Sequence, residues 1–309
     1  MRSPFHNTFA SGPLDRGGDQ RNAPGFVAHH TGDPAARMIG FVGGEPLLEG
    51  AHLARLPLGE STPEIFLGFE NGAPLFACKL EQAPPALEAV GLRAAAALIG
   101  EADSAIAAAG RSLIHWHERN AFCAACGGAS TVSGAGWRRW CAHCKLEHFA
   151  RVDPVVIMLA IHGRGDDAVC LVGRQSGWPE GRFSALAGFI EPGESLEDAC
   201  ARELFEEAGV RAVRFAYHSS QPWPFPGQLM IAMMAEVSGR DLTLDPAELS
   251  EARWLDRASV RAILASEAGH DGVIAPPRLA IARSLLEAFA QERSVTSPVR
   301  AGAPSNSSA

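Results

Sequence analysis

Short apolar runs bounded by turn residues predict the strands of this chain. Residues 64–69 and 74–78 flank Asn71-Gly72, a dipeptide that favours the tight turn of a β-hairpin. Residues 155–161 form a β-branched run with the length of a buried strand. Further strands are expected at residues 168–172, 183–190 and 229–237.

Longer stretches between these runs have the character of helices. Residues 86–118 are rich in alanine and predict helix, with breaks expected at Gly100 and Gly110. Further helices are predicted from Leu196 to Ala208 and from about Pro277 to Gln291. Because strands and helices are mixed and do not strictly alternate, we expect an α+β fold or a mixed-sheet α/β sandwich.

Composition divides the chain into segments. Residues 1–36 are rich in Gly, Pro, Asp and Arg, residues 292–309 are rich in Ser, Pro and Gly, and both are expected to be disordered. Between them we expect an N-terminal domain at 37–118, a cysteine segment at 119–149 and a larger domain at 150–291.

The overall charge limits the classes of partner. The chain has 309 residues, a formal net charge of −8 and a pI near 5.8, which argues against a broad nucleic-acid-binding face but not against a pocket for one nucleotide. No run approaches the roughly 18 apolar residues that span a bilayer, and the first ten residues lack an apolar signal region. We therefore expect no membrane partner and a cytoplasmic protein.

The predicted helix at residues 196–208 has recognisable ends and one acidic flank. Ser195 and Asp198 suit a capping box, and Gly209 suits a left-handed stop. An apolar arc that can pack on a sheet is formed by Leu196, Cys200, Leu204, Phe205 and Ala208. On the adjoining flank, within an arc of roughly 100°, lie Glu203, Glu206 and Glu207.

Two interpretations fit these three carboxylates. Glu-Glu pairs on helices usually form a solvated acidic face. Carboxylates crowded beside a buried stripe repel one another, however, and a hard divalent cation such as Mg²⁺ or Mn²⁺ removes that repulsion. Clustering alone leaves the choice open.

Four of the seven cysteines form two Cys-x-x-Cys pairs, Cys123 with Cys126 and Cys141 with Cys144. The pairs are separated by 14 residues, a spacing that suits a tetrahedral zinc ribbon with one structural zinc per chain. A redox role would need a thioredoxin-like context, which the flanking sequence lacks. With four thiolates available, His143 and His148 are expected at the surface.

Alternating prolines stiffen the segment from Ser220 to Pro226 and fix the exposure of Trp223 and Phe225. Rigid aromatic side chains suit stacking against a base or a nicotinamide ring. A proline-rich loop that packs two aromatic rings into the core fits the composition equally well.

The complete pattern around the acidic helix resembles the Nudix box. Its fixed positions are matched by Gly188, by Glu194 and by residues 202–210, with gaps of five and seven residues. The resemblance implies a loop–helix–loop that presents glutamates to divalent cations bound to a substrate diphosphate. It also implies a Nudix mixed-sheet α/β/α sandwich, preceded here by the zinc ribbon and a smaller N-terminal α+β domain.

The same resemblance assigns roles to individual residues. Glu203 and Glu207 resemble metal ligands, and Glu206 resembles a ligand or a supporting carboxylate. Arg202 would orient the glutamates by ion pairing. Further candidate ligands are the carbonyl of Ala187 and the carboxylate of Glu248. The general base stays open between the helix carboxylates and a hydroxide held by the metal.

Other segments resemble the NADH pyrophosphatase subfamily of the Nudix hydrolases. They are the zinc pair, the proline–aromatic segment, Leu75-Phe-Ala and Trp116-His117. The substrate contacts that this resemblance implies are Arg93, Phe149, Gln221, Pro222, Trp223, Pro224, Phe225, Pro226, Gly227 and Gln228. The chain departs from the pattern at Gln228, where Ser is usual, at Phe149, where Tyr is frequent, and at Gly136, where some members have an acidic residue.

The resemblance implies a homodimeric enzyme that splits the pyrophosphate of NADH or NAD⁺ into NMN(H) and AMP with Mg²⁺ or Mn²⁺. Alternatives within this chemistry are removal of NAD caps from RNA 5′ ends and a broader dinucleoside or ADP-ribose pyrophosphatase. An alternative of another class is a zinc-ribbon nucleic-acid binder with a decayed Nudix domain. The intact glutamates and the acidic pI argue against that alternative.

Overall fold

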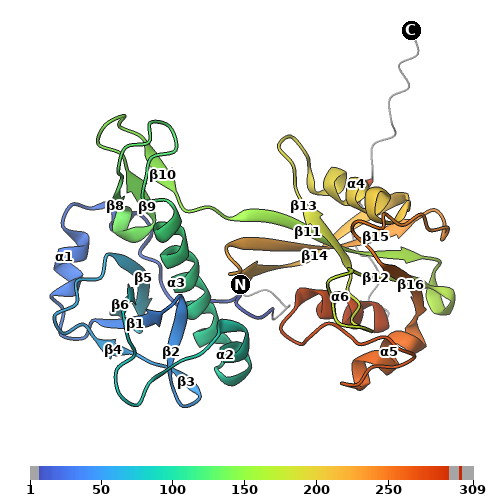
Figure 1. The fold of residues 1–309 in the computed structure, drawn as a ribbon, viewed down its shortest axis with the longest axis horizontal. Helices are drawn as coiled ribbons and strands as arrows, with labels where there is room; N and C mark the ends of the chain where they lie inside the picture. The colour runs from blue at the N-terminus through green and yellow to red at the C-terminus, as the bar shows by residue number, and fades with distance from the viewer. Residues whose placement is uncertain (1–6, 292–298, 301–309) are drawn as a thin grey trace, which may run out of the picture. The chain divides into compact units, whose positions relative to one another are not determined.

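The computed structural model describes residues 7–291 and the backbone of residues 299–300 (Figure 1). The chain forms two compact units. The first contains the residues up to Val152 together with Pro222–Gln228, and the second contains Asp153–Gln221 and the residues from Leu229 onward. No helix among the described residues is both long enough and apolar enough to cross a membrane.

The first unit is built on a seven-stranded sheet. Its strands are β1 (Arg37–Val42), β2 (Glu45–Glu49), β3 (His52–Leu53), β4 (Leu56–Pro57), β5 (Ile65–Glu70), β6 (Ala73–Lys79) and β7 (Glu88–Ala89). The main path runs β3-β2-β1-β6-β5, with β4 paired to β1 and β7 paired to β2. The predicted hairpin is confirmed as β5 and β6, with Asn71 and Gly72 at positive φ in its turn.

Two helices follow the sheet, α2 (Leu92–Leu98) and α3 (Glu101–Arg119). The expected break at Gly100 is confirmed, but the expected break at Gly110 is wrong, because α3 runs through that glycine. A Cβ atom at position 110 would lie 2.8 Å from the ring of Phe41. Gly110 therefore serves close packing of the helix on the sheet.

The N-terminal segment contains η1 (Gly18–Asn22) and α1 (Phe26–Thr31), so the expectation of disorder is wrong for these residues. Phe26 is buried and packs edge-on against Phe66, which anchors α1 to β5. The C-terminal segment 292–309, also expected to be disordered, lies outside the described residues except for the backbone of β17 (Val299–Arg300).

A three-stranded antiparallel sheet forms the cysteine segment, in the order β10-β9-β8. Its strands are β8 (Thr131–Ser133), β9 (Arg138–Trp140) and β10 (Glu147–Phe149), with η2 (Gly134–Gly136) between β8 and β9. Gly136 has φ +90°, and a Cβ there would lie 2.6 Å from Cα of Ile65. An acidic side chain, which the resemblance allows at this position, therefore has no room here.

The second unit is a sheet covered by helices on both faces (Figure 1). Its path is β16-β12-β11-β15-β14-β17, and β13 pairs with β11. The strands are β11 (Asp153–His162), β12 (Val169–Arg174), β13 (Leu186–Phe189), β14 (Ala212–Trp223), β15 (Gln228–Val237) and β16 (Glu251–Asp256). A short η3 (Gly165–Asp167) precedes β12.

Successive side chains of β11 point to opposite faces of the sheet, which explains why helices pack on both faces. Ile157 and Leu159 pack with α5 (Arg257–Ala265) and α6 (Ile281–Ala290), whereas Val156 and Met158 pack with α4 (Leu196–Ala208) on the opposite face. This is the α/β/α sandwich that the Nudix resemblance implied. The sequence did not predict β14, which includes the start of the proline–aromatic segment.

Candidate functional site

The ends of α4 are fixed as predicted. The Ser195 hydroxyl accepts a hydrogen bond from the Asp198 amide, and the Asp198 carboxylate accepts one from the Ser195 amide, which completes the capping box. Gly209 ends the helix with φ +71°. The predicted placement of Phe205 in the buried apolar arc is wrong. The residue is 47% exposed, and the guanidinium of Arg211 lies over its ring.

Three carboxylates converge beside α4. One oxygen from each of Glu203, Glu207 and Glu248 lies within 4.8 Å of the others. Glu203 and Glu207 are buried, and Glu248 is exposed. Glu206 is not in this cluster, and its side chain is 53% exposed.

The surroundings of the cluster disfavour negative charge. Burial, followed by the nearby Glu248 and Glu203 carboxylates, raises the pKa of Glu207 to about 8, against a hydrogen bond from the backbone at Ala187. Burial is also the main cause of a raised pKa at Glu203. Within residues 7–291, Arg202 pairs with Glu203 but no ion pair is formed by Glu207 or Glu248, so a divalent cation fits the donor set.

Arg202 organises the other side of the cluster. Its guanidinium donates to both carboxylate oxygens of Glu194 at 2.6 and 2.8 Å, to Glu203 at 2.7 Å and to Glu206 at 3.1 Å. The hydrogen bonds from Arg202 are the main cause that lowers the pKa of Glu194 to about 2. The structure thus gives Glu194 a function that the sequence did not assign, namely anchoring the arginine that orients Glu203.

Gly188 makes room for Glu203. It lies on β13 opposite Val156, and a Cβ atom there would sit 1.8 Å from the carboxyl carbon of Glu203. Any side chain at this position would displace the carboxylate. The glycine of the Nudix box therefore has a steric reason in this chain.

The loop that carries Glu248 is attached to the end of α4. The amide of Thr243 donates to the carbonyl of Ala208 at 2.9 Å, and the amide of Asp245 donates to the carbonyl of Glu207 at 3.1 Å. The Asp245 carbonyl then accepts from the Glu248 amide at 3.1 Å. Carbonyls left free by the end of the helix thus hold the third carboxylate in place.

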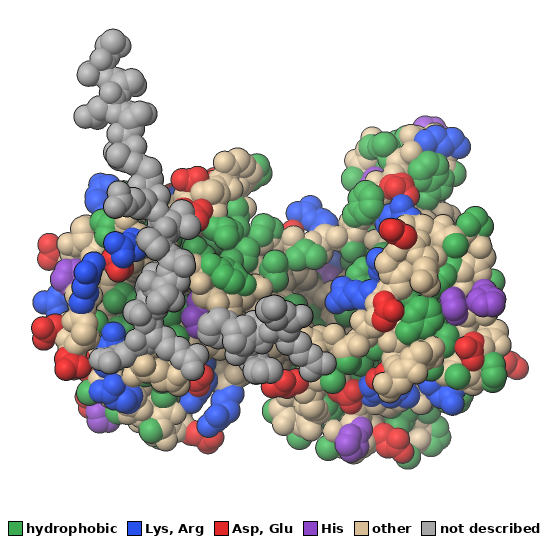
Figure 2. All heavy atoms as spheres, turned by 180° about the vertical axis from the view of Figure 1, so that it is seen from behind, with side chains coloured by type: hydrophobic (Ala, Val, Ile, Leu, Met, Phe, Trp, Pro, Cys, Tyr) green, Lys and Arg blue, Asp and Glu red, His purple; other side chains and the backbone are tan. Residues whose placement is uncertain are grey.

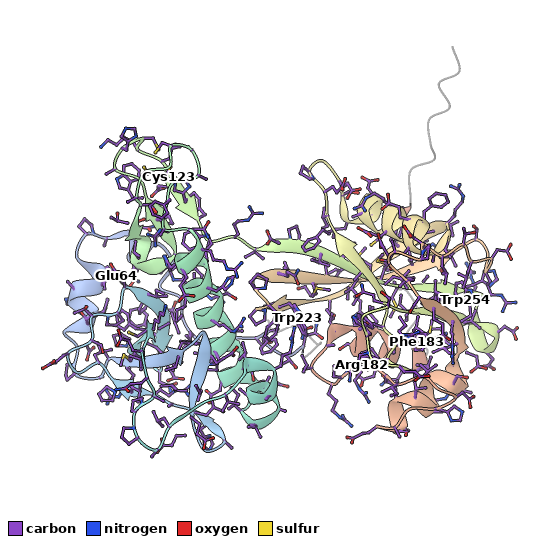
Figure 3. All side chains as sticks on the ribbon, in the orientation of Figure 1. Glu64, Cys123, Arg182, Phe183, Trp223 and Trp254 are labelled. Atoms are coloured by element: carbon purple, nitrogen blue, oxygen red, sulfur yellow. The ribbon has the colours of Figure 1, made fainter. Side chains whose placement is uncertain are left out.

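The four predicted cysteines meet in one cluster, with all their sulfur atoms within 4.8 Å of one another. Sγ of Cys123 lies 3.4 Å from that of Cys144, and Sγ of Cys126 lies 3.5 Å from that of Cys141. Figure 3 labels Cys123 in this ribbon. Four thiolates fill a tetrahedral zinc site and leave no open position, so the donor set suits a structural ion.

One histidine near the cysteines differs from expectation. His143 is exposed as predicted, but His148 is half-buried with Nε2 at 3.1 Å from Sγ of Cys123. A hydrogen bond from an imidazole to a thiolate lowers the negative charge on the sulfur, and the sulfur stays the metal ligand.

The proline–aromatic segment ends β14 and turns into β15 (Figure 3, Trp223). Trp223 and Phe225 are half-buried, with ring centroids 5.2 Å apart, and both make edge contacts with the buried Phe9. The guanidinium of Arg93 lies over Phe225 at 4.1 Å and near Trp223 at 5.8 Å. The structure therefore brings together three predicted substrate contacts and adds Phe9.

Arg111 holds this segment in place. It donates to the carbonyl of Pro224 and, at 3.3 Å, to Glu45, and its guanidinium lies 5.0 Å from the centroid of Phe225. The sequence did not predict Arg111 or Glu45, because both are far from the segment along the chain.

The other predicted contacts have varied surroundings. Gln221 is buried, donates to the Leu279 carbonyl at 2.8 Å and accepts from the Ile281 amide at 2.9 Å, so its side chain holds the start of α6. Phe149 is 63% exposed in the ribbon. The remaining positions are the exposed Pro222 and Pro226, the buried Pro224, and the half-buried Gly227 and Gln228.

Comparisons with known families cover most of the chain. A NUDIX domain model matches residues 151–275, an NADH pyrophosphatase-like rudimentary NUDIX domain matches residues 34–116, and an NADH pyrophosphatase zinc ribbon domain matches residues 118–149.

The chain is also similar to individual proteins. The chain is 36% identical over 250 residues to the NAD-capped RNA hydrolase NudC of Mycobacterium bovis. The aligned region covers 77% of this chain and 79% of that protein. The chain is 40% identical over 195 residues to the human NAD-capped RNA hydrolase NUDT12. This alignment covers 60% of the chain and 42% of the human protein, so the chain spans less than half the length of that relative. A Nudix hydrolase structure from Nitrosomonas europaea aligns with 22% identity and a TM-score of 0.42, over 56% of this chain and 91% of that one.

Replacing Gly188 by Ala tests the steric argument. The added methyl group must displace the Glu203 carboxylate, and misplacing a catalytic group by about 1 Å can lower a rate by about 100-fold. We expect kcat to fall by about that factor with little change in Tm. Gly177→Ala is the control, because nothing lies within 4 Å of a Cβ at that position. Unchanged turnover in Gly188→Ala would contradict the predicted role of Glu203.

Metal analysis of the purified chain should find one zinc. Cys141→Ser should lose it and lower the free energy of unfolding by roughly 3 kcal/mol or more, a fall in Tm on the order of 10 °C. Cys78→Ser, at a half-buried cysteine outside the ribbon, is the control. A stable, correctly folded protein without zinc would rule out a structural ion.

Proposed function

Since this chain belongs to the NADH pyrophosphatase family of Nudix hydrolases, we propose that it hydrolyses the pyrophosphate of NADH or NAD⁺ to NMN(H) and AMP. The observation that carries the proposal is the convergence of Glu203, Glu207 and Glu248 within 4.8 Å. Oxygen donors in this number suit a hard divalent cation, and a pyrophosphate offers that cation its remaining ligands.

Glu203, Glu207 and Glu248 would hold Mg²⁺ or Mn²⁺, with Glu206 and the carbonyl of Ala187 as further ligands. When bound, the cation neutralises charge on the diphosphate and lowers the pKa of water. The protein contributes by fixing the donors before substrate arrives. Arg202 keeps Glu203 and Glu206 in one orientation, and the loop to Glu248 is tied to the end of α4.

The net reaction adds one water across the P–O–P bond. The water oxygen bonds to one phosphorus, the bridging oxygen leaves with the other phosphoryl group, and the water gives up a proton. Burial is the chief cause that raises the pKa of Glu207 to about 8, and a bound cation would favour its charged form. The general base stays open between the helix carboxylates and a hydroxide that a bound cation would supply.

Substrate selection would fall to the aromatic segment. Trp223 and Phe225 offer ring faces for stacking, and the guanidinium of Arg93 lies beside both of them. Contacts from Pro222, Pro224, Pro226, Gly227, Gln228 and Phe149 belong to the same proposal. Gln221 would act only through the backbone that it fixes.

A second candidate function is removal of NAD caps from RNA 5′ ends. It is favoured by the names of two relatives, the mycobacterial and human NAD-capped RNA hydrolases. The bond broken and the adenosine half are the same in both substrates. A broader activity on dinucleoside or ADP-ribose diphosphates is a third possibility within the same chemistry.

We also propose a cytoplasmic homodimer. The resemblance to the family supports the dimer, and a reducing compartment suits the cysteine thiolates of the ribbon. Light scattering at several protein concentrations measures the oligomeric state, and a monomer throughout would contradict the proposed dimer.

The direct test is release of AMP from NADH in the presence of Mg²⁺ or Mn²⁺. AMP and NMNH in equal amounts, with no release in a chelator, are the expected result. Parallel steady-state measurements on NAD⁺, ADP-ribose and NAD-capped RNA rank the substrates. No release from any of the four would refute the proposal.

Glu207→Gln should lower kcat by orders of magnitude without unfolding the protein. The substitution keeps the shape of the side chain and removes the charge that would hold the cation against the diphosphate. Glu206→Gln should have a smaller effect, because that side chain lies outside the carboxylate cluster. Glu197→Gln, on the first turn of the same helix, is the control. Near-normal turnover of Glu207→Gln at saturating metal would contradict the assignment.

Trp223→Ala or Phe225→Ala should lower kcat/KM for NADH by about 5- to 150-fold, the range that corresponds to stacking on one base. The loss should be smaller for ADP-ribose, which lacks nicotinamide, if the ring contacts that half. Equal losses on both substrates with unchanged Tm would place the ring on the adenine half. A lowered Tm would indicate a packing role, and full activity in both variants would refute substrate selection by this segment.

A further inference from the structure

One face of the zinc ribbon carries aromatic and cationic side chains, of which the proposed reaction uses only Phe149. In β9, Arg138 and Trp140 lie on the same face, because side chains two residues apart in a strand point the same way. Phe149 lies directly opposite Arg138, so it belongs to that face as well. Arg139 and His148 lie on the other face, where Arg139 is buried against Ser130 and His117.

Two further arginines lie beside Trp137, the residue that precedes Arg138 in the chain. The guanidinium groups of Arg21 and Arg16 lie 4.3 and 5.2 Å from the Trp137 ring centroid. Arg138 reaches the same region, since it donates to Asn22 in η1. Two guanidinium groups therefore lie against a single indole ring, and the charge of a third, Arg138, acts on Arg21.

These positive charges have little compensation. Glu147 pairs with Arg138 at 2.7 Å, but within residues 7–291 neither Arg16 nor Arg21 forms an ion pair with a carboxylate. Nη1 of Arg21 is shielded from solvent without a hydrogen-bond partner. Burial and then the charges of Arg16 and Arg138 lower the pKa of Arg21. An anion at this surface would relieve the repulsion.

The surface is local. Figure 2 shows Lys and Arg side chains interspersed with Asp and Glu over the face that it draws, in keeping with a net charge of −8. Such a chain does not attract polyanions over its whole surface. A short strip of rings and arginines can still contact a few nucleotides.

We propose that the ribbon face of Phe149, Arg138 and Trp140, with Trp137, Arg21 and Arg16, binds the single-stranded RNA that follows an NAD cap. Rings on a sheet surface stack on bases in a sequence-independent way, and adjacent arginines contact the phosphates between them. Trp140 and Phe149 are diagonal neighbours, with side chains about 7–8 Å apart. This inference rests on the second proposed function, removal of NAD caps.

The position of Phe149 indicates in which direction the RNA would run over the ribbon face. Phe149 is also a proposed contact for the dinucleotide, so the RNA would leave the cap there and continue over Arg138 and Trp140. NADH has no chain beyond its adenosine half that could continue over Arg138 and Trp140. The ribbon would thus distinguish capped RNA from the free dinucleotide.

The test compares two substrates in the full-length, zinc-loaded protein. Trp140→Ala should raise KM for an NAD-capped RNA of about 12 nucleotides by about 5- to 150-fold. The values of kcat and KM for NADH should stay within about twofold of wild type. Zinc content and Tm check the fold. Should Trp140→Ala lose zinc, Arg16→Glu serves in its place, because Arg16 is exposed.

Direct binding gives a readout that does not depend on turnover. Fluorescence anisotropy with a 5′-hydroxyl single-stranded RNA should show weaker binding in Arg16→Glu, and the slope of log K against log salt should flatten by about 0.7 per lost phosphate contact. Arg164→Glu, at an arginine whose side chain is 82% exposed in the other unit, is the control and should bind like wild type.

Equal losses on NADH and capped RNA, or unchanged capped-RNA kinetics and RNA affinity in both ribbon variants, would overturn the inference. Binding of a duplex as tightly as a single strand, without dependence on Trp140, would also overturn it. In these cases intact NADH hydrolysis would leave the proposed function standing. Absence of hydrolysis of both NADH and capped RNA in the wild-type protein would instead refute the proposed function.

Discussion

The carboxylates of Glu203 and Glu207 are buried where α4 meets β13, and their mutual repulsion with Glu248 governs the design of the site. Each neighbouring feature serves to keep the charges together. Gly188 leaves the space that the Glu203 carboxylate occupies. Arg202, itself anchored by Glu194, neutralises one side and leaves the other open. A group of like charges held in this way favours binding of a divalent cation.

The parts of the fold with strong local determinants could be predicted from sequence. The bounds of α4 are correct, because a capping box and a left-handed glycine specify both of its ends. The cysteine cluster follows from the spacing of two pairs, since four thiolates at that spacing have few other arrangements. The hairpin of β5 and β6 follows from its Asn-Gly turn.

Features that depend on distant neighbours could not be predicted. Helix α3 continues through Gly110 because the ring of Phe41 packs against it, and nothing near Gly110 in sequence indicates that contact. Arg111 reaches Pro224 across 113 residues. Helical periodicity placed Phe205 on the apolar arc, but its ring lies at the edge of the packed face and is exposed. The spacing of apolar residues predicts which side of a helix faces the sheet. How far the sheet extends over that side depends on the tertiary structure and cannot be predicted from the spacing.

The central claim is that Glu203, Glu207 and Glu248 together form a divalent-cation site. Electron paramagnetic resonance of free Mn²⁺, titrated with the full-length protein, measures binding without substrate or turnover. We predict saturable binding in the wild-type protein and at least about tenfold weaker binding in Glu248→Gln, because removing one charged ligand of three weakens a hard-cation site. Equal Mn²⁺ affinity in the two proteins would contradict the account.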